Sequence, residues 1–300
     1  MEVIRVNNLY KTFKSKRKKV NALNGMSFTV NKGEILGFLG PNGAGKSTTI
    51  KIMMDLIRAD RGSAKILGID SSSPVARLKV GFMPENPQYY DTLTGYDLLM
   101  FSAAIFKVDK NVAKKRAWEL LEEFELKDAA KRPIRKYSKG MIQRIGFAST
   151  LIHDPEILIL DEPMSGLDPM GRVLFKNKML ELNKKGVTIF FSSHIIPDIE
   201  DICSRVLIVN RGKVVKSLEK TEIKYLTTTG FKVIIDNPVN IGLKLEKITD
   251  NLYSFLCPKN NLIDILEKLK AHSTEIIDIE PVKKSLEDIF VEITLKSNDN

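Results

Sequence analysis

The chain has 300 residues, of which 43% are apolar and 28% are charged, as in a folded globular protein and unlike a disordered or fibrous one. This length exceeds one comfortable core, so we expect a main domain and a smaller one. No run approaches the roughly 20 apolar residues that cross a bilayer, and the first residues lack the layout of a signal peptide. The sequence therefore predicts an intracellular chain that does not span a membrane. Cys203 and Cys257 are too few and too far apart for a disulfide framework or a zinc site.

The net charge of +10 is spread unevenly along the chain. Residues 1–216 carry 36 basic against 23 acidic side chains, a net of +13, whereas residues 217–300 carry 11 Lys against 14 acidic side chains, a net of −3. A basic excess of this kind suits nucleic acid, an anionic membrane face or a polyphosphate. Its densest part, residues 14–19, lies between two strand-like runs, and we interpret it as a solvated hairpin tip. Contact with a membrane surface or a partner loop is the alternative.

The first third of the chain predicts strands that lead into a glycine-rich loop. Short β runs occur at residues 3–6, 26–30 and 35–39, and the last continues directly into the loop at residues 40–47. After Ser47, apolar residues recur at helical spacing. Strand, loop and helix in this order are the context in which such a loop binds phosphate.

A helical block then interrupts the α/β pattern. A β run at residues 79–83 is followed by helical spacing from about residue 94 to 125. Continuous apolar runs at residues 157–160, 188–191 and 206–209 predict parallel strands that are covered on both faces. Residues 170–184 predict a crossover helix that ends near Gly186.

The C-terminal part predicts a separate small domain. Residues 224–230 contain three consecutive Thr residues and indicate a linker. Beyond them, β runs at residues 231–235, 252–256 and 275–279 alternate with a helical pattern at residues 262–269, and Ser285 with Asp288 predicts a capping box. We therefore expect a main domain at residues 1–220, with a helical subdomain at about 86–150, and an α+β domain at residues 221–300.

The glycine-rich loop has the residue types that a nucleotide triphosphate requires. Gly43 and Gly45 allow the chain to curl so that backbone N–H groups meet the phosphates, Lys46 reaches the β and γ groups, and Ser47 is the predicted Mg²⁺ ligand. The predicted nucleotide-binding residues of the loop are Gly40, Pro41, Asn42, Gly43, Ala44, Gly45, Lys46, Ser47 and Thr48. The loop alone predicts nucleotide binding.

Two adjacent carboxylates end the strand predicted at residues 157–160. At the carboxyl edge of a parallel sheet, Asp161 can hold Mg²⁺, and Glu162 can face the γ-phosphate and orient or deprotonate an attacking water. A solvated Asp-Glu pair is the alternative, which the upstream loop disfavours. This division of labour predicts hydrolysis.

Four segments, taken together, resemble the ATP-binding subunits of ABC transporters. They are residues 137–144, 157–163, 165–169 and 191–194. The match covers roughly residues 1–216, and the ordered combination is more specific than any single motif. The resemblance implies an α/β fold, namely a P-loop NTPase domain of the ABC type with an inserted helical subdomain. It also implies ATP and Mg²⁺ as cofactors, and an ATPase reaction.

The resemblance further implies that the active site is completed by a second subunit. Ser138 and Gly140, in the signature loop with Lys139 and Met141, would contact the γ-phosphate of ATP held by the opposite subunit. Asp168 would lie at the dimer seam.

Three further residues acquire roles in the chain's own site. His194, which follows a β run, would contact the γ-phosphate and join Glu162 and Lys46 as a catalytic residue. Phe13 would stack on the adenine, although an aromatic residue near a strand end is often part of the core. Glu85 would be a ligand of Mg²⁺ or its water.

The sequence departs from the commonest family pattern in two places. The signature loop reads Tyr-Ser-Lys-Gly-Met where Leu-Ser-Gly-Gly-Gln is usual, and Glu85 replaces a Gln. These departures, with the closing Ser-Leu-Glu-Asp-Ile-Phe, resemble the ATPase subunits of the ABC-2 type, which mostly power export.

The leading hypothesis is an ATPase subunit that drives a separate transmembrane permease. It would dimerise with an identical chain or with another ABC ATPase, and would lie in the cytoplasm on the inner face of the membrane through that permease. The alternative is a soluble ABC ATPase that acts on nucleic acid or ribosomes, but one motif set without heptads does not favour it, and we expect no stable nucleic acid partner. A P-loop kinase would leave the signature loop unexplained.

Overall fold

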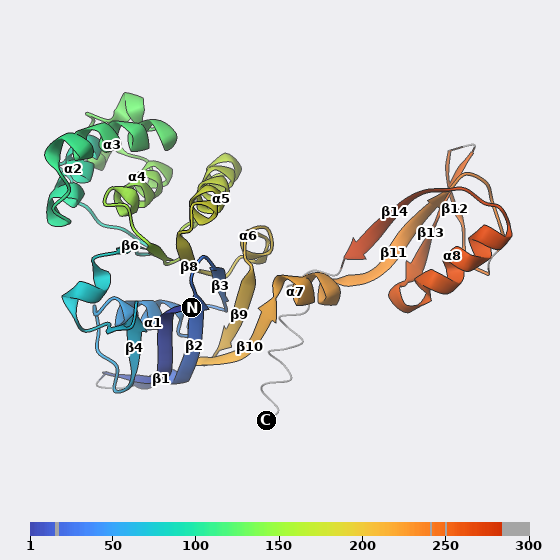
Figure 1. Cartoon of the computed structure of the whole chain (residues 1–300), viewed down its shortest axis with the longest axis horizontal. Coiled ribbons are helices and arrows are strands. Elements are labelled where there is room, and N and C mark those ends of the chain that lie inside the picture. The colour runs from blue at the N-terminus through green and yellow to red at the C-terminus, as the bar shows by residue number, and fades with distance from the viewer. Residues whose placement is uncertain (16–17, 241, 250, 284–300) are drawn as a thin grey trace. The chain divides into compact units, whose positions relative to one another are not determined.

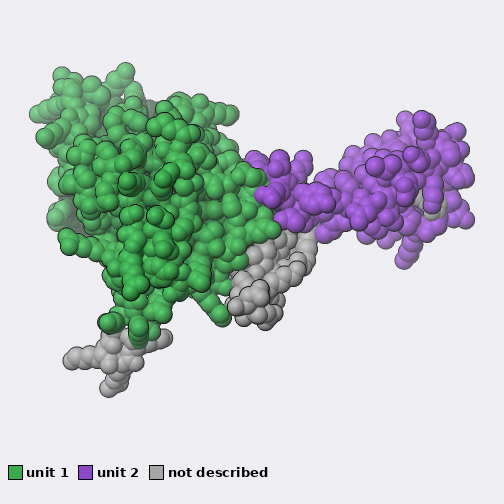
Figure 2. Space-filling model, turned by 60° about the horizontal axis from the view of Figure 1, so that its bottom comes forward, with its two compact units in different colours: residues 1–219 green, residues 220–300 purple. Residues whose placement is uncertain are grey.

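The computed structural model describes residues 1–15, 18–240, 242–249 and 251–283, so the predicted capping box at Ser285 and Asp288 lies outside the described residues. The chain divides into two compact units, Met1–Glu219 and Lys220–Asn300, which Figure 2 shows in different colours. Within the described residues, no helix is both long and apolar enough to cross a bilayer.

The first unit is built on two sheets. One is antiparallel, with the order β2-β1-β4-β5, and the other has the order β10-β9-β3-β8-β7-β6, in which only the edge strand β10 is antiparallel to its neighbour. The strands of this unit are β1 (Glu2–Ser15), β2 (Lys18–Asn31), β3 (Ile35–Leu39), β4 (Arg61–Ile66), β5 (Ile69–Asp70), β6 (Val80–Met83), β7 (Ile157–Leu160), β8 (Thr188–Ser193), β9 (Arg205–Asn210) and β10 (Lys213–Glu219).

The helices of the first unit include one compact group. Three of them pack together at one end, away from the antiparallel sheet, as Figure 1 shows for α2, α3 and α4. The helices are α1 (Lys46–Met53), α2 (Gly95–Ile105), α3 (Lys110–Glu123), α4 (Lys139–Leu151), α5 (Pro169–Lys184) and α6 (Ile196–Glu200), with 3₁₀ turns at Pro74–Arg77, Lys127–Ala129 and Ile134–Lys136. This group of three is the helical block that the sequence predicts after residue 86.

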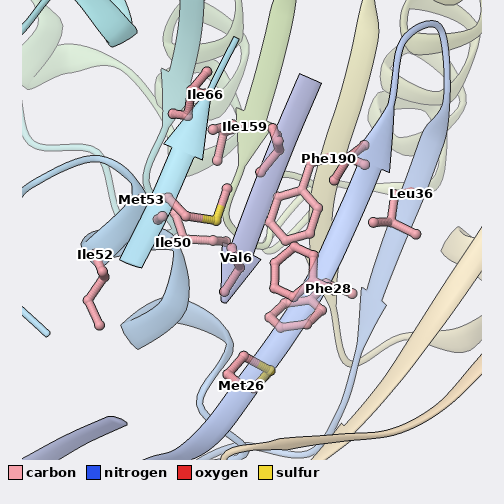
Figure 3. Packing of buried hydrophobic residues seen from close by; sticks show 14 of the residues in the cluster. Val6, Met26, Phe28, Leu36, Ile50, Ile52, Met53, Ile66, Ile159 and Phe190 are labelled. Carbon is pink, nitrogen blue, oxygen red and sulfur yellow. The ribbon is translucent and has the colours of Figure 1, made fainter. Parts of the chain in front are cut away.

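The main core lies between the two sheets and α1. Phe28 of β2, Phe38 of β3 and Phe190 of β8 form an aromatic cluster with ring centroids 5.2–5.5 Å apart. Figure 3 shows side chains of α1 and of both sheets gathered in one layer, with Ile50 and Met53 among them. Because α1 is held by this core, the loop in front of it is held between two rigid elements.

The predicted parallel strands are confirmed. The strands at residues 35–39, 157–160, 188–191 and 206–209 all form, and all four belong to the six-stranded sheet. The predicted strands at residues 3–6 and 26–30 are parts of longer strands that pair as one hairpin. Lys14 and Lys19 are exposed at its end, opposite each other, and the tip at residues 16–17 lies outside the described residues.

The predicted linker at residues 224–230 is wrong. Residues Lys220–Thr227 form α7, and β11 (Thr228–Ile235) follows at once. The threonine hydroxyls explain how these poor helix formers fit: Oγ1 of Thr227 donates to the carbonyl of Ile223 at 2.9 Å, and Oγ1 of Thr228 donates to that of Lys224 at 2.8 Å.

The second unit has its own antiparallel sheet and core. The sheet order is β12-β13-β11-β14, and a cluster that includes Val233, Phe255 and Leu269 packs α8 against it. Its remaining elements are β12 (Glu246–Thr249), β13 (Leu252–Pro258), a 3₁₀ turn at Lys259–Asn261, α8 (Leu262–Ala271) and β14 (Ile276–Lys283).

Candidate functional site

The glycine-rich loop joins β3 to α1 at the carboxyl edge of the parallel sheet. Gly45 has φ +102°, and a Cβ on it would lie 2.7 Å from the carbonyl oxygen of Ala22, so glycine is required there. Gly45 is also the N-cap of α1 and offers no side-chain cap to the first-turn N–H groups. The positive end of α1 is therefore open toward an anion.

Lys46 is the first residue of α1 and is buried, with 6% of its surface exposed. Its Nζ donates to the carbonyl of Gly40 at 2.6 Å and lies 3.2 Å from Oε1 of Glu162. The loop and the strand-end carboxylate are thus in direct contact.

A single serine joins the carboxylate of Asp161 to the backbone of Glu162. Oγ of Ser192, in the neighbouring strand β8, donates to Oδ1 of Asp161 at 2.6 Å and accepts from the backbone N–H of Glu162 at 2.9 Å. Glu162 has φ +47°, which is uncommon for a residue other than glycine. This backbone turn sends Asp161 and Glu162 to different partners.

Burial raises the pKa of Asp161, while hydrogen bonds with Ser192 and Ser47 oppose that rise and the charge of Glu162 adds to it. The hydroxyl of Ser47 is thus one of the hydrogen-bond partners of Asp161, and two of the predicted Mg²⁺ ligands lie together. Hydroxyl and carboxylate oxygens are the donors that Mg²⁺ prefers, which means that these residues fit the ion.

His194 completes the contacts of Glu162. Its Nδ1 lies 2.9 Å from Oε2 of Glu162, and its side chain is 46% exposed. Glu162 thus has Lys46 on one carboxylate oxygen and His194 on the other.

Lys46 and Glu162 line a cleft of about 460 Å³, whose lining includes neither Asp161 nor His194. The cleft brings the loop together with Glu85, Glu162 and Phe13, and Phe13 is 45% exposed at its edge. Its lining is Phe13, Val20, Ala22, Pro41, Asn42, Gly43, Gly45, Lys46, Ser47, Thr48, Glu85 and Glu162. A larger cavity of about 740 Å³ lies at the amino ends of β7 and β8, but two of the charged pairs at it, Arg116 with Asp154 and Lys178 with Glu123, are satisfied internally.

The signature segment lies elsewhere in the first unit. Ser138 is the N-cap of α4 and accepts from the backbone N–H of Met141 at 3.2 Å, while Asp168 caps α5 by accepting from Gly171 at 2.7 Å. Among the described residues, the lining of the 460 Å³ cleft includes neither of these caps, nor Lys139 or Gly140. The structure therefore does not bring either cap into the cleft of the chain's own loop.

The three unusual signature residues each have a partner. Tyr137 is buried, and its hydroxyl donates to the carbonyl of Ala129 at 2.8 Å. Sδ of Met141 accepts from Arg132 at 3.0 Å. The Lys139 side chain covers Gly166, with Cε only 2.6 Å from the position of a Cβ there.

Sequence reasoning missed two residues of this region. Ser192 lies in segment 191–194, which carries the family resemblance, but the sequence analysis assigns no role to it. Gln143 is buried on α4, and its amide donates to the carbonyl of Glu85 at 3.0 Å. It therefore holds the backbone of a predicted Mg²⁺ ligand from within the helical block.

Comparison with known proteins identifies the family. The family model described as ABC transporter matches residues 23–165. An uncharacterized ABC transporter ATP-binding protein of Synechocystis sp. is 36% identical over 97% of this chain and 83% of its own length. The chain belongs to the ATP-binding proteins of ABC transporters.

Other ABC transporter ATP-binding proteins are similar over most of the chain. The linearmycin resistance ATP-binding protein LnrL of Bacillus subtilis is 33% identical over 92% of this chain and 94% of its own length. A fluoroquinolones export ATP-binding protein of Mycobacterium tuberculosis is 35% identical over 98% of this chain and 93% of its own length.

Solved structures agree with this assignment. A structure of an ATP-binding subunit of an ABC transporter is 30% identical, covers 75% of this chain and 92% of its own, and has a TM-score of 0.68. A dimeric ATP-binding cassette in a post-hydrolysis state, bound to ADP and phosphate, is 25% identical over 72% of this chain and 98% of its own, with a TM-score of 0.67. This ABC transporter ATP-binding protein is therefore an ATP-hydrolysing subunit that powers a transporter, and the nucleic acid alternative is not supported.

Proposed function

We propose that two such ATPase subunits sandwich two Mg·ATP and drive a separate transmembrane permease that exports its substrate. The observation that carries this proposal is the convergence of Lys46 and His194 on Glu162, beside the glycine-rich loop. The printed functions of the linearmycin and fluoroquinolone relatives support export, without naming a substrate for this chain.

The residues of the chain's own site are proposed to bind the phosphates, the adenine and Mg²⁺. The N–H groups of the loop and Lys46 hold the phosphates, and Phe13 stacks on the adenine. Ser47, Asp161 and Glu85 would hold Mg²⁺, which supplies charge neutralisation at the phosphates.

Glu162 is the proposed base of hydrolysis. It accepts a proton from water as the water oxygen bonds to the γ-phosphorus, and the bond from that phosphorus to the β-phosphate oxygen breaks to release ADP and phosphate. His194 orients Glu162 and contacts the γ-phosphate. Because Nζ of Lys46 lies 3.2 Å from Oε1 of Glu162, the lysine must leave this oxygen for the phosphates before Glu162 can act as the base.

The second subunit completes the site. The N-terminus of α4, with Ser138 and Gly140, is proposed to bind the γ-phosphate of ATP held by the partner, and Asp168 to lie at the seam. The dimeric neighbour bound to ADP and phosphate supports this arrangement. The partner is an identical chain or a related ATPase.

The helical block is the proposed contact with the permease. Phe101 and Ile105 of α2 are 49% and 61% exposed, and Tyr90 just before the helix is 71% exposed. Exposed apolar side chains of this kind suit a protein partner. Through that partner the subunit would lie on the cytoplasmic face of the membrane, and closure of the dimer would move the block.

The variant Glu162→Gln tests the assigned base. We expect at least a hundredfold loss of turnover, unchanged ATP binding by titration, and a stable dimer with ATP by light scattering. Glu181→Gln, on the exposed end of α5, is the matched control and should turn over ATP normally. Wild-type turnover in Glu162→Gln would refute the role of Glu162.

Purification of the tagged chain from its native membrane tests the permease. We expect co-purification of a membrane protein whose removal abolishes the coupling of ATP turnover to transport. A stable and fully active complex without any membrane subunit would contradict the proposal.

A further inference from the structure

Ion pairs join α5 to α6 beside the loop that carries His194, and Figure 1 shows the two helices next to each other. Nη1 of Arg172 lies 3.0 Å from Oδ2 of Asp198, and Nζ of Lys176 lies 3.2 Å from Oδ1 of the same carboxylate. Nζ of Lys176 also lies 2.7 Å from Oδ2 of Asp201 and 3.3 Å from the carbonyl of Pro197. Arg172 and Lys176 are one turn apart on α5, so one face of that helix holds α6.

Asp198 is the buried centre of this network. It is 2% exposed, whereas Asp201 has a side-chain exposure of 62%. Burial opposes the charge of Lys176, yet hydrogen bonds with Asp201 and Asp198 raise its pKa above the ordinary value, so the cation persists. A buried ion pair contributes little net stability compared with apolar packing, and the role of such a pair is often to specify geometry.

Helix α6 has only five residues, so its position must be set by its neighbours. A helix of this length has little stability of its own, and its N-cap, Ile195, provides no side-chain hydrogen bond. Ile199 fixes α6 against the sheet, because it is fully buried next to Gly37 of β3. That apolar contact sets the depth of α6, while Asp198 ties it to α5.

The start of α6 is connected directly to His194. Only Ile195 separates them, and the backbone N–H of Ile195 donates to Oγ of Ser193 at 2.9 Å. His194 in turn lies 2.9 Å from Glu162. On the other side, the backbone N–H of Arg172 donates to the carbonyl of Asp168 at 3.0 Å, so the network begins one turn after the predicted dimer seam.

We propose that Asp198 is a positioning residue that holds His194 against Glu162 by fixing α6 to Arg172 and Lys176 of α5. The inference rests on the proposed role of His194 and Glu162 in hydrolysis. It adds that the seam at Asp168 and the His194 loop are joined within one chain, so that a movement of α5 changes the position of His194.

A double-mutant cycle tests this inference on the full chain. For Asp198→Asn we expect turnover to fall about ten- to a hundredfold while the KM for ATP stays within about twofold, and Asp198→Glu should recover part of the loss. His194→Ala should lower turnover by itself. The combination of Asp198→Asn with His194→Ala should be no slower than His194→Ala alone, because both changes remove the same contact.

Asp201→Asn is the matched control, since it removes an exposed carboxylate from the same network. We expect its turnover to stay within about twofold of wild type. If Asp198→Asn does not fold, Arg172→Gln replaces it, because that change leaves Lys176 to balance Asp198 and should give the same loss of turnover at unchanged KM.

Proton NMR of the histidine rings supplies a readout that altered stability alone would not move. The chain has three histidines, so the His194 ring signals are assigned by their loss in His194→Ala. In Asp198→Asn we expect the His194 signals to shift while those of His153 and His272 stay in place.

The outcomes distinguish a wrong role of His194 from a wrong role of Asp198. Normal turnover in His194→Ala would overturn the proposed role of His194, and with it the inference. Reduced turnover in His194→Ala, together with additive losses in the double variant or unshifted His194 signals in Asp198→Asn, would overturn the inference alone.

Discussion

Nζ of Lys46 lies 3.2 Å from Oε1 of Glu162, and the two side chains are 6% and 8% exposed. Under the proposed roles, the lysine that would bind phosphate and the carboxylate that would accept a proton are therefore ion-paired with each other. This contact makes the two residues interdependent in stability, and it would have to open for Glu162 to act as the proposed base.

Lys46→Ala should weaken ATP binding strongly and should also destabilise the fold by about 1–3 kcal/mol, because Glu162 is left buried without its cation. A nucleotide titration and a denaturant midpoint measure the two effects. In Lys46→Ala combined with Glu162→Gln the midpoint should recover, while ATP binding stays weak. If Lys46→Ala and the double variant have equally low denaturant midpoints, the lost ion pair is not the cause of the lower stability.

Phe13→Ala should reduce affinity for ATP by roughly three- to tenfold, since one stacked ring contributes about 0.5–1.5 kcal/mol. The affinity for GTP should fall by a similar factor, because stacking tolerates any base. Phe101→Ala is the matched control: Phe101 is 49% exposed against 45% for Phe13, but it lies on α2, away from the cleft. Equal affinities of wild type and Phe13→Ala for ATP would contradict the proposed stacking of Phe13 on the adenine.

Gly95→Ala should destabilise the helical block, because its new Cβ would lie 2.3 Å from the hydroxyl oxygen of Tyr137. Tyr137→Phe should cost about 1 kcal/mol through the lost hydrogen bond to Ala129. In the Tyr137→Phe background, the ring carbon Cζ at 3.2 Å becomes the nearest atom of residue 137, so Gly95→Ala should cost less there than in wild type. Melting temperatures of the four proteins decide this, and a constant cost would show that the clash is not with the hydroxyl.

His153 should make the fold less stable in mild acid. Burial lowers its pKa to about 4, although a hydrogen bond to the carbonyl of Val80 opposes the shift. In the unfolded chain histidine takes up a proton near pH 6.5, so the unfolded state binds more protons as the pH falls from about 6.5 toward 4, and stability falls in that window. His153→Gln should lose less stability there, whereas His272→Gln, at an exposed position, should behave as wild type. Parallel pH profiles of melting temperature for wild type and His153→Gln would contradict this account.

Much of the core and of the candidate cleft could be predicted from the sequence, because the local sequence pattern and the tertiary role of these residues agree. The strand before Gly40 and the strand before Asp161 are continuously apolar, and both are covered on two faces in the structure. Parallel strands bring their carboxyl ends to one edge, which is why Lys46 and Glu162 could be expected to meet.

Other features depend on contacts that no local pattern reveals. Strands β4 and β5 are short and mostly exposed, so they carry no continuous apolar pattern. They form because β4 pairs with β1. The threonines predict a linker where α7 lies, because threonine is a poor helix former. The sequence pattern does not reveal that the hydroxyls of Thr227 and Thr228 satisfy backbone carbonyls one turn earlier. The Asp198 network joins residues about 25 positions apart on two helices, and neither helix signals the other.

The contacts of the Ser192 hydroxyl with Asp161 and Glu162 form only if strands β7 and β8 pair in the correct register. Leu160 pairs with Phe191, so Ser192 comes into place one position beyond the last pair of β7 with β8. A slip of one residue between these strands would turn neighbouring side chains to the opposite faces of the sheet. Asp161 and Glu162 would then lose their common hydrogen-bond partner. A misaligned sheet would consequently be an inactive one, and the specific activity of a preparation reports the fraction of molecules whose central strands are in register.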